Sequence, residues 1–313
     1  FMKFTLSWLK DYLKTDATLE DIVKGLTDLG LEVEGVKDPL KELGHFLVGE
    51  IIETYQHPNA DRLKVCKVSI GESVKQIICG APNARPGIKV VVAQPGDYIP
   101  GLGNIIKTGK IRGVESQGMM CSERELMLSD EHDGIIELNT NKRAGTKYID
   151  QCDNLDAVID IAITPNRPDA LGVKGIARDL AAKGLGELTI RNIPKVKGTF
   201  TCPLTIKLTK EVSQNDCPLF VGRYIRGVHN AQSPKWLQER LTAIGLRPIS
   251  ALVDITNYVT FDCARPLHVF DAAKLDGDLT VRKATEGETI VALDGSEYKL
   301  CVTDTVISSG KSV

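Results

Sequence analysis

The chain has 313 residues, which is enough for two or three domains. Hydrophobic residues make up 42% and charged residues 26%, the balance of an ordinary soluble globular protein. The formal net charge of -2 gives no compositional support for a nucleic-acid-binding face, and no apolar run reaches the roughly 20 residues that a membrane-spanning helix needs.

Cysteine usage points to a reducing compartment. The eight cysteines are scattered and form no C-x-x-C pair, so we expect free thiols and no zinc or other metal site. The first residues lack the apolar core and cleavage site of a signal peptide, and a cytoplasmic location is the expectation.

The first 40 residues predict two short helices. Thr18 and Asp21 resemble a capping box, and an apolar stripe at helical spacing follows before Gly30, a typical C-terminal cap. The stripe consists of Leu19, Ile22, Val23, Leu26 and Leu29. It fits either a helix-turn-helix or a face that packs in a core, and core packing is the preferred interpretation.

Residues 46–139 have the texture of a small β-barrel. Short β-type runs are separated by Gly, Pro and Asn, which predicts a five-stranded Greek-key barrel. Its expected strands are Phe46–Tyr55, Leu63–Ile70, Val74–Cys79, Lys89–Ala93 and Asn104–Ile111.

A further helix is expected at Val173–Lys183, closed by Gly184. Its apolar face comprises Val173, Ile176, Ala177 and Leu180. Because neither this helix nor the stripe at 18–29 has a core of its own, we expect the two to pack together. The barrel would then be an insertion in a discontinuous first domain.

From about residue 199 a third region begins, with expected strands at Leu204–Leu208 and Leu219–Val228. Ser233-Pro234 predicts a helix start, with Trp236, Leu237, Leu241 and Ile244 on one side and Gly245 at the end. Asp294-Gly295 predicts a hairpin between Ile290–Leu293 and Tyr298–Leu300. The expected fold class is therefore a multi-domain α+β protein.

No reaction can be read from the residues alone. The chain contains no phosphate-binding loop, zinc-protease motif, serine-hydrolase elbow or kinase signature. None of the five histidines is paired with another at metal-ligand spacing. A structural role is the ordinary interpretation for each of them.

Three strings in the barrel nevertheless resemble a known family. In order they are His57-Pro58-Asn59-Ala60-Asp61-Arg62-Leu63, Cys79-Gly80-Ala81-Pro82-Asn83 and Ser116-Gln117-Gly118-Met119-Met120-Cys121-Ser122-Glu123. Together they resemble the tRNA-binding barrel of free-standing tRNA-binding proteins and of bacterial phenylalanine–tRNA ligase β chains. The ligase is singled out by further strings at 7–12, 29–34, 163–169, 175–178, 247–248, 253–259 and 266–271.

The resemblance implies three domains: a discontinuous α/β domain (1–41 and 151–198), an inserted OB-fold barrel (42–150), and the first part of an α+β editing domain (199–313). It offers seven polar or basic barrel residues as RNA contacts: Asn59, Arg62, Lys64, Asn83, Arg85, Ser116 and Ser122. The same strings can equally consist of turn residues and core packing that maintain the barrel.

The resemblance also implies an enzyme that joins phenylalanine to tRNA(Phe) with ATP and Mg²⁺, as an α2β2 heterotetramer whose α chain forms the adenylate. The β chain would hydrolyse mischarged tyrosyl-tRNA. In this chain the editing pocket would contain His268, Thr256, Asn257, Pro266 and Leu267. Arg265 and Ser250 depart from the family pattern, and the acidic residue that senses the tyrosine hydroxyl would lie beyond residue 313, so we expect little editing and no bound cofactor.

Three other functions fit the same residues. A tRNA-binding chaperone would need no partner chain, and a stand-alone esterase would turn over mischarged tRNA by itself. A structural scaffold would bind no RNA even at low salt, where phosphate contacts are strongest.

Overall fold

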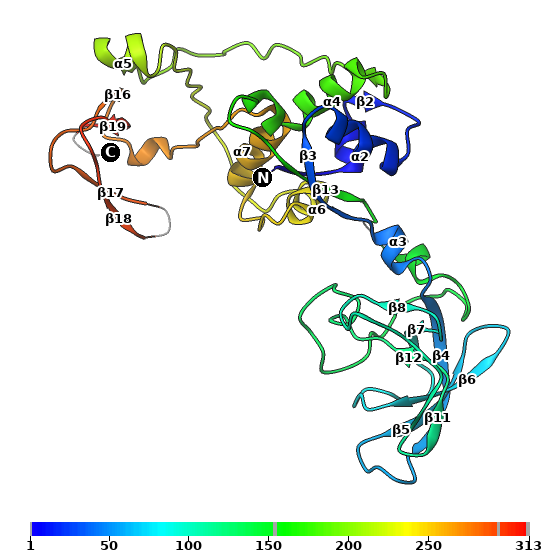
Figure 1. The fold of residues 1–313 in the computed structure, drawn as a ribbon. Coiled ribbons are helices and arrows are strands. Elements are labelled where there is room, and N and C mark those ends of the chain that lie inside the picture. Colours follow the sequence, from blue (N-terminus) through cyan, green and yellow to red (C-terminus); the bar gives the residue numbers. More distant parts are fainter. Residues whose placement is uncertain (1, 153–154, 293–294, 311–313) are drawn as a thin grey trace. The chain divides into compact units, whose positions relative to one another are not determined.

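The computed structural model describes residues 2–152, 155–292 and 295–310 (Figure 1). The chain divides into two compact units, Phe1–Leu188 and Thr189–Val313. None of the described helices has the length and apolar character to cross a membrane. None of the eight cysteines, all of which lie in the described part of the chain, forms a disulfide.

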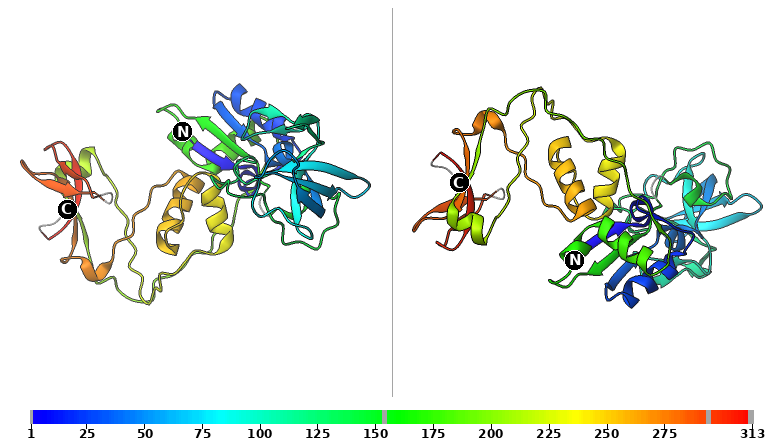
Figure 2. Two further views of the ribbon diagram at one scale, coloured as in Figure 1. Left: turned by 90° about the horizontal axis from the view of Figure 1, so that it is seen from below. Right: turned by 90° about the horizontal axis from the view of Figure 1, so that it is seen from above.

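The first unit begins with a three-stranded antiparallel sheet of order β1-β13-β3. Its strands are β1 (Met2–Thr5), β3 (Glu32–Lys37) and β13 (Val158–Ala162), and Figure 2 shows the blue β1 beside the green β13. A short ribbon pairs β2 (Leu13–Lys14) with β14 (Glu187–Leu188). The helical elements of this part are α1 (Leu6–Lys10), α2 (Leu19–Asp28), η2 (Pro168–Leu171) and α4 (Val173–Ala182).

Helices α2 and α4 form as the sequence predicts. The capping box of Thr18 and Asp21 is present, and Gly30 and Gly184 take the left-handed φ values of 77° and 87° that follow helix ends. The predicted face of α4 is fully buried. A Cβ on Gly25 of α2 would collide with Leu185, which follows α4, and Lys183 lies 3.0 Å from Asp28. The predicted contact between these two helices is therefore confirmed.

The three strands of this sheet were not assigned from the sequence. β3 has the pattern Glu-Val-Glu-Gly-Val-Lys and is mostly exposed, so it lacks the alternation of buried apolar residues that identifies a strand. β3 is a strand because its backbone pairs with β13, and its own side-chain pattern does not predict this.

The segment between β3 and β13 contains the barrel. Five antiparallel strands form a sheet of order β12-β7-β4-β5-β6. They are β4 (Leu47–Gln56), β5 (Lys64–Ser69), β6 (Val74–Cys79), β7 (Lys89–Ala93) and β12 (Met119–Met120). Helix α3 (Pro39–Leu43) precedes the barrel, and η1 (Tyr148–Gln151) follows it.

The sheet curls until its edges meet. The Gln117 N–H donates to Gln76 O on β6 at 2.8 Å, and the Ile78 N–H donates to Ser116 Oγ at 3.1 Å. A register shift in β4 between Ile51 and Glu53 assists the bend. The predicted small barrel is thereby confirmed as a nearly closed sheet. Its interior is a core of buried apolar residues that includes Ile51, Val68, Ile77, Val90, Val92 and Met120.

One predicted barrel strand was wrong. Asn104–Ile111 does not join the five-stranded sheet: β9 (Asn104–Ile105) pairs with β8 (Tyr98–Ile99), and β10 (Gly109–Ile111) pairs with β11 (Val114–Ser116). The residues of β9 and β10 are exposed, so they supply no inward-facing apolar side chains. The fifth strand is β12 instead, where Met120 is buried.

The second unit contains a three-stranded sheet, a hairpin and helices. β15 (Ile206–Leu208) runs parallel to β16 (Leu279–Lys283), which pairs antiparallel with β19 (Thr305–Ser309). The predicted hairpin forms between β17 (Thr289–Val291) and β18 (Glu297–Lys299). Leu293, at the end of the first predicted strand, and Asp294, in the predicted turn, lie outside the described residues. The helical elements are α5 (Lys210–Asn215), α6 (Lys235–Ala243), α7 (Ala251–Cys263) and η3 (Ala272–Lys274).

Two further predictions in this unit were wrong. Leu219–Val228 forms no strand, because within the described residues it has no strand partner, and Leu219, Val221 and Ile225 are 65–77% exposed. Helix α6 begins one residue later than predicted, with Pro234 rather than Ser233 as N-cap. The Ser233 hydroxyl instead donates to the buried Asp254 carboxylate.

The predicted apolar face of α6 is confirmed for Leu237, Leu241 and Ile244, which are buried. Trp236 is 53% exposed and does not belong to that face. Gly245, at φ 86°, ends the helix as predicted.

Candidate nucleic-acid interface

The loop between β4 and β5 is held by a buried histidine. His57 Nδ1 accepts the Asn59 N–H at 3.0 Å, so Nε2 carries the proton and donates to Ile111 O at 3.0 Å. Asn59 Nδ2 adds a bond to Arg112 O at 3.1 Å. Hydrogen bonds therefore hold the segment 57–63, the first of the three that resemble the tRNA-binding family, against the β10–β11 hairpin.

Asn83 and Arg85 fasten the next loop. The Asn83 amide makes two bonds with the Ile135 backbone, donating to its O at 2.8 Å and accepting from its N at 3.1 Å. Arg85 is exposed and pairs with Glu137 through both terminal nitrogens, at 3.1 and 2.5 Å. Asn83 is thus a bridge within the barrel, whereas Arg85 keeps a guanidinium at the surface.

Ser116 and Ser122 are buried. Besides accepting from Ile78 N, Ser116 Oγ donates to Gly118 O at 3.1 Å. Ser122 Oγ accepts from Glu125 N at 3.4 Å. Both hydroxyls are engaged inside the barrel.

Lys64 brings two of the predicted segments together. Its Nζ donates to Ala84 O at 2.7 Å, which joins the start of β5 to the loop of Asn83 and Arg85. Arg62, two residues before Lys64, is exposed. Below this surface burial raises the pKa of the Cys66 thiol to about 12, and burial also raises the pKa of Cys79, so both thiols stay neutral and unreactive.

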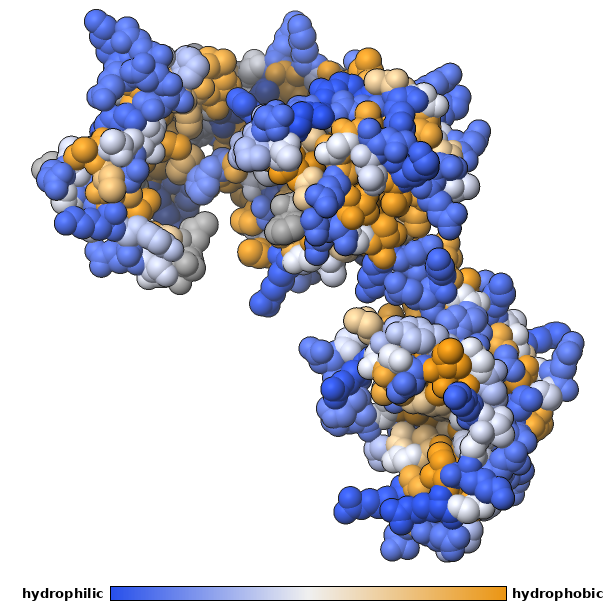
Figure 3. All heavy atoms as spheres, viewed as in Figure 1, coloured by the Kyte–Doolittle hydropathy of each residue, from blue (hydrophilic) through white to orange (hydrophobic). Residues whose placement is uncertain are grey.

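The β10–β11 hairpin is a basic feature that the sequence reasoning missed. Lys107, Lys110 and Arg112 are exposed on or next to it, and the turn places Arg112 and Gly113 at φ 46° and 91°. The signal was available as three basic residues within six positions ahead of a glycine. Figure 3 shows that the end of the barrel carrying β5 and β11 is mostly hydrophilic.

The second set of predicted site residues lies on and after α7. Thr256 and Asn257 belong to the helix, and the Thr256 hydroxyl donates to Val253 O at 2.7 Å. The helix ends where Ala264 takes a left-handed φ of 54°. Pro266, Leu267 and His268 follow in an exposed segment, where the His268 ring stands 4.4 Å from that of Phe270. Across the described residues no hydrogen bond joins His268 to Thr256 or Asn257.

No metal site accompanies either set. In residues 2–152, 155–292 and 295–310, no three or more His, Cys, Asp or Glu side chains are grouped to hold an ion.

Comparison with known families assigns a class to each part. Residues 46–147, which contain the barrel, match the family described as "Putative tRNA binding domain", and residues 216–313 match the B3/4 domain family. With the barrel fold, these matches define a protein that joins a tRNA-binding barrel to a B3/4 domain.

Whole-chain relatives make the assignment specific. The phenylalanine–tRNA ligase β subunit of Paramagnetospirillum magneticum is 57% identical over 98% of this chain, and that of Ruegeria pomeroyi is 59% identical over 95%. Over nearly its whole length the chain is therefore similar to the β subunits of phenylalanine–tRNA ligases. It spans 38% of the length of these two relatives. A solved MetRS-related protein from Pyrococcus horikoshii matches 33% of the chain with a TM-score of 0.25 and 22% identity.

Proposed function

We propose that this chain is the tRNA-handling part of a phenylalanine–tRNA ligase β subunit. The single observation that carries the proposal is identity of 57% over 98% of the chain to such a subunit. An OB-fold barrel (42–150) would interrupt a discontinuous domain (1–41 and 151–198), and residues 199–313 would begin an editing domain. The pairing of β3 with β13 on either side of the barrel supports the insertion.

In the proposed complete enzyme, two α and two β chains join phenylalanine to tRNA(Phe) with consumption of ATP in the cytoplasm. The α chain would form the adenylate, and ATP and Mg²⁺ would act there. The described residues of this chain hold no cluster that fits the metal. The proposed task of this chain is to bind and inspect the RNA, in keeping with the match of residues 46–147 to a tRNA-binding domain family.

Within the barrel, Arg62, Lys64 and Arg85 are the proposed phosphate contacts, and Lys110 and Arg112 extend them. Cations at the surface displace counterions from RNA, which gives affinity that falls as salt rises. Asn59, Asn83, Ser116 and Ser122, also predicted as contacts, would act by holding the loops that present these cations. Their hydrogen bonds within the barrel support this division.

A second site in the β subunit would allow the enzyme to distinguish phenylalanine from tyrosine. An apolar pocket made for phenylalanine rejects an added hydroxyl by only about 10²-fold, whereas a pocket with a buried partner for that hydroxyl can select tyrosine. His268, Thr256, Asn257, Pro266 and Leu267 are the proposed lining of such an editing pocket. We propose that residues 199–313 are only part of that domain, because Leu219, Val221 and Ile225 stay exposed.

The proposal is tested by expressing the longer β reading frame with its α partner and measuring phenylalanylation of tRNA. We expect charging by the pair and none by the 313-residue chain. Titration of tRNA with this chain at ~50 and ~200 mM salt should show affinity that falls steeply with salt. An inactive pair would refute the ligase assignment, and phenylalanylation by the 313-residue chain alone would refute the proposed division of labour between the two chains.

A further inference from the structure

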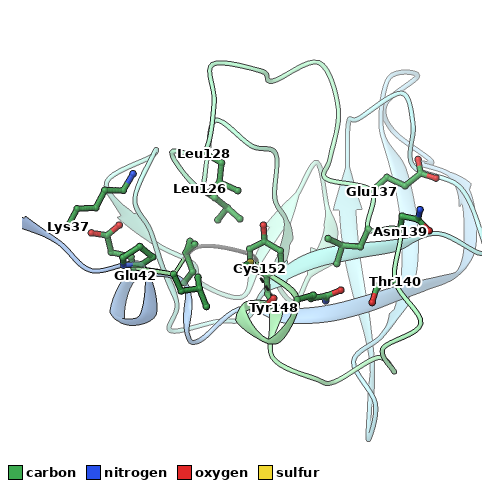
Figure 4. A pocket seen from close by; sticks show the side chains of 14 residues that line it. Lys37, Glu42, Leu126, Leu128, Glu137, Asn139, Thr140, Tyr148 and Cys152 are labelled. Atoms are coloured by element: carbon green, nitrogen blue, oxygen red, sulfur yellow. Dashed lines mark hydrogen bonds between the residues drawn. The ribbon is translucent and has the colours of Figure 1, made fainter. Parts of the chain in front are cut away.

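A cavity of about 490 Å³ lies in the first unit beside α3 and the barrel (Figure 4). Binding sites for ligands commonly have about 300–1,000 Å³. Its apolar lining comes from Leu43, Leu126, Leu128, Leu138, Tyr148 and Leu155. Leu43, Leu126 and Tyr148 also belong to a buried core cluster, so this part of the wall is rigid.

An unsatisfied donor lies in the lining. Gln151, the last residue of η1, lines the cavity, and its Nε2 is buried without a hydrogen-bond partner. Leaving a buried donor of this kind unpaired is unfavourable, because it has lost its hydrogen bonds to water without replacement. The neighbouring Cys152 thiol donates to Tyr148 O at 3.5 Å. A ligand carbonyl in the cavity would satisfy this amide.

The loop above the cavity is closed on itself by Arg124 N–H to Glu131 O at 3.0 Å and Leu128 N–H to Glu123 O at 2.9 Å. At its tip Met127 has φ 55°, a left-handed conformation that is strained for a non-glycine residue. The loop buries Leu126 but leaves Met127 59% and Leu128 46% exposed. Leu128 therefore lines the cavity while it is also exposed to solvent. Exposed apolar side chains next to a cavity are typical of docking sites.

Charge identifies the class of partner. Residues 123–137 carry Glu123, Glu125, Asp130, Glu131, Asp133 and Glu137 against the single basic residue Arg124. Glu42 adds another carboxylate to the lining, opposed by Lys37 and by Arg85 on Glu137. We call the acidic segment 123–137, which carries the lining residues Leu126, Leu128 and Glu137, the acidic rim; its negative charge repels RNA and attracts basic groups.

We propose that this cavity binds a basic protein segment, which inserts one apolar side chain between Leu126, Leu128 and Tyr148. A carbonyl of the segment accepts from Gln151 Nε2, and its lysines or arginines face the acidic rim. The site is separate from the RNA-contact surface and does not depend on the proposed ligase function.

The test uses fluorescence anisotropy with the 313-residue chain. The probe is a labelled peptide that alternates leucine and lysine, and its matched controls alternate serine with lysine and leucine with glutamate. We expect the leucine–lysine peptide alone to bind. Leu128→Ser and Gln151→Leu should each weaken it by about 10-fold, the size of one well-buried contact. Ile52→Ser, an equally exposed barrel position outside the cavity, is the control variant.

Hydrogen exchange provides the second measurement. Bound peptide should slow exchange at residues 126–128 and 148–152 and leave 52–56 unchanged. The proposal is overturned if the leucine–lysine peptide fails to bind, if the serine–lysine peptide binds equally well, or if the Leu128 and Gln151 variants bind like the parent. Binding of a labelled single-stranded RNA that is sensitive to Leu128→Ser would also overturn it, in favour of a nucleic-acid ligand.

Discussion

Asn83 and Ile135 are joined by two hydrogen bonds across 52 positions of sequence, one donated and one accepted by the same side-chain amide. The side-chain amide pairs with the Ile135 backbone as a neighbouring strand would, and so holds the 133–137 segment against the loop after β6. The neighbouring Arg85–Glu137 pair joins the same two segments at the surface. One loop therefore contains a buried structural contact next to an exposed charge.

Substitution of Asn83 by Leu should destabilise the barrel by about 1–3 kcal/mol, because it leaves the Ile135 N–H and C=O without partners. Urea unfolding followed by fluorescence or circular dichroism measures the change. Arg85→Ala is the matched comparison and should lose at most about 1 kcal/mol, because the ion pair is solvent-exposed. Equal losses in the two variants would contradict the structural role of Asn83.

The proposed RNA contacts can be distinguished from structural residues by the salt dependence of tRNA binding. Arg62→Ala and Arg112→Ala should each weaken tRNA binding and reduce the slope of log affinity against log salt by about 1. Lys10→Ala, an exposed cation on α1 outside the barrel, is the charge-matched control. Unaltered slopes in both barrel variants would remove these residues from the proposed surface.

The sequence predicts an element well where the element's own apolar pattern determines its structure, and poorly where a distant partner does. Strands β4 to β7 and helices α2 and α4 carry their own apolar periodicity and were predicted closely. Strand β12 has only two residues, Met119 and Met120, and becomes a strand only by pairing with β7. Leu219–Val228 has strand-like residues but no strand partner, which no local pattern can reveal.

For the candidate site, the resemblance pointed to three segments of the barrel but could not divide their residues by role. Asn83 and Arg85 are two positions apart, and only the fold shows that one faces the barrel and the other the solvent. The basic hairpin around Arg112 was overlooked because the near-neutral total charge concealed a local excess. The cavity at Gln151 depends on residues from 37 to 155 and has no sequence signal.

The packing of α2 near α4 predicts a measurable effect at Gly25. Gly25→Ala would normally favour a helix by about 1 kcal/mol. Here the added methyl must displace the terminal Cδ1 of Leu185 and lies 3.3 Å from Leu180 Cδ2, so we expect the repacking to offset this gain and to leave no net stabilisation. Thermal unfolding compares it with Lys24→Ala, an exposed site on the same helix. A stabilised Gly25→Ala variant would show that α2 and α4 are not packed as described.

Acid dependence should reveal the ionic cluster at the start of α4. Arg167 first, and Arg178 next, hold the pKa of Asp169 well below its ordinary 3.8 through hydrogen bonds. A depressed folded pKa contributes stability that is complete above 3.8 and is lost as pH falls toward the lower folded value. Asp169→Asn should therefore be less stable than the parent at neutral pH, and the difference should shrink in strong acid. Urea unfolding at several pH values checks this, and a constant difference would contradict it.

The proposed editing activity should depend on the length of the polypeptide. Within the described residues, Leu219, Val221 and Ile225 lack a covering element, and His268 stands in an exposed segment. We therefore expect the 313-residue chain to hydrolyse tyrosyl-tRNA hardly at all, whereas the longer β subunit with its α partner should do so readily. In that complex His268→Ala should lower hydrolysis about 10-fold or more, within the range for a positioning or proton-transfer group, without lowering phenylalanylation. Hydrogen exchange should show residues 219–228 protected in the longer chain and unprotected in this one. Rapid hydrolysis by the 313-residue chain would mean that its pocket is already complete, and unchanged hydrolysis in the His268 variant would remove that residue from the editing site.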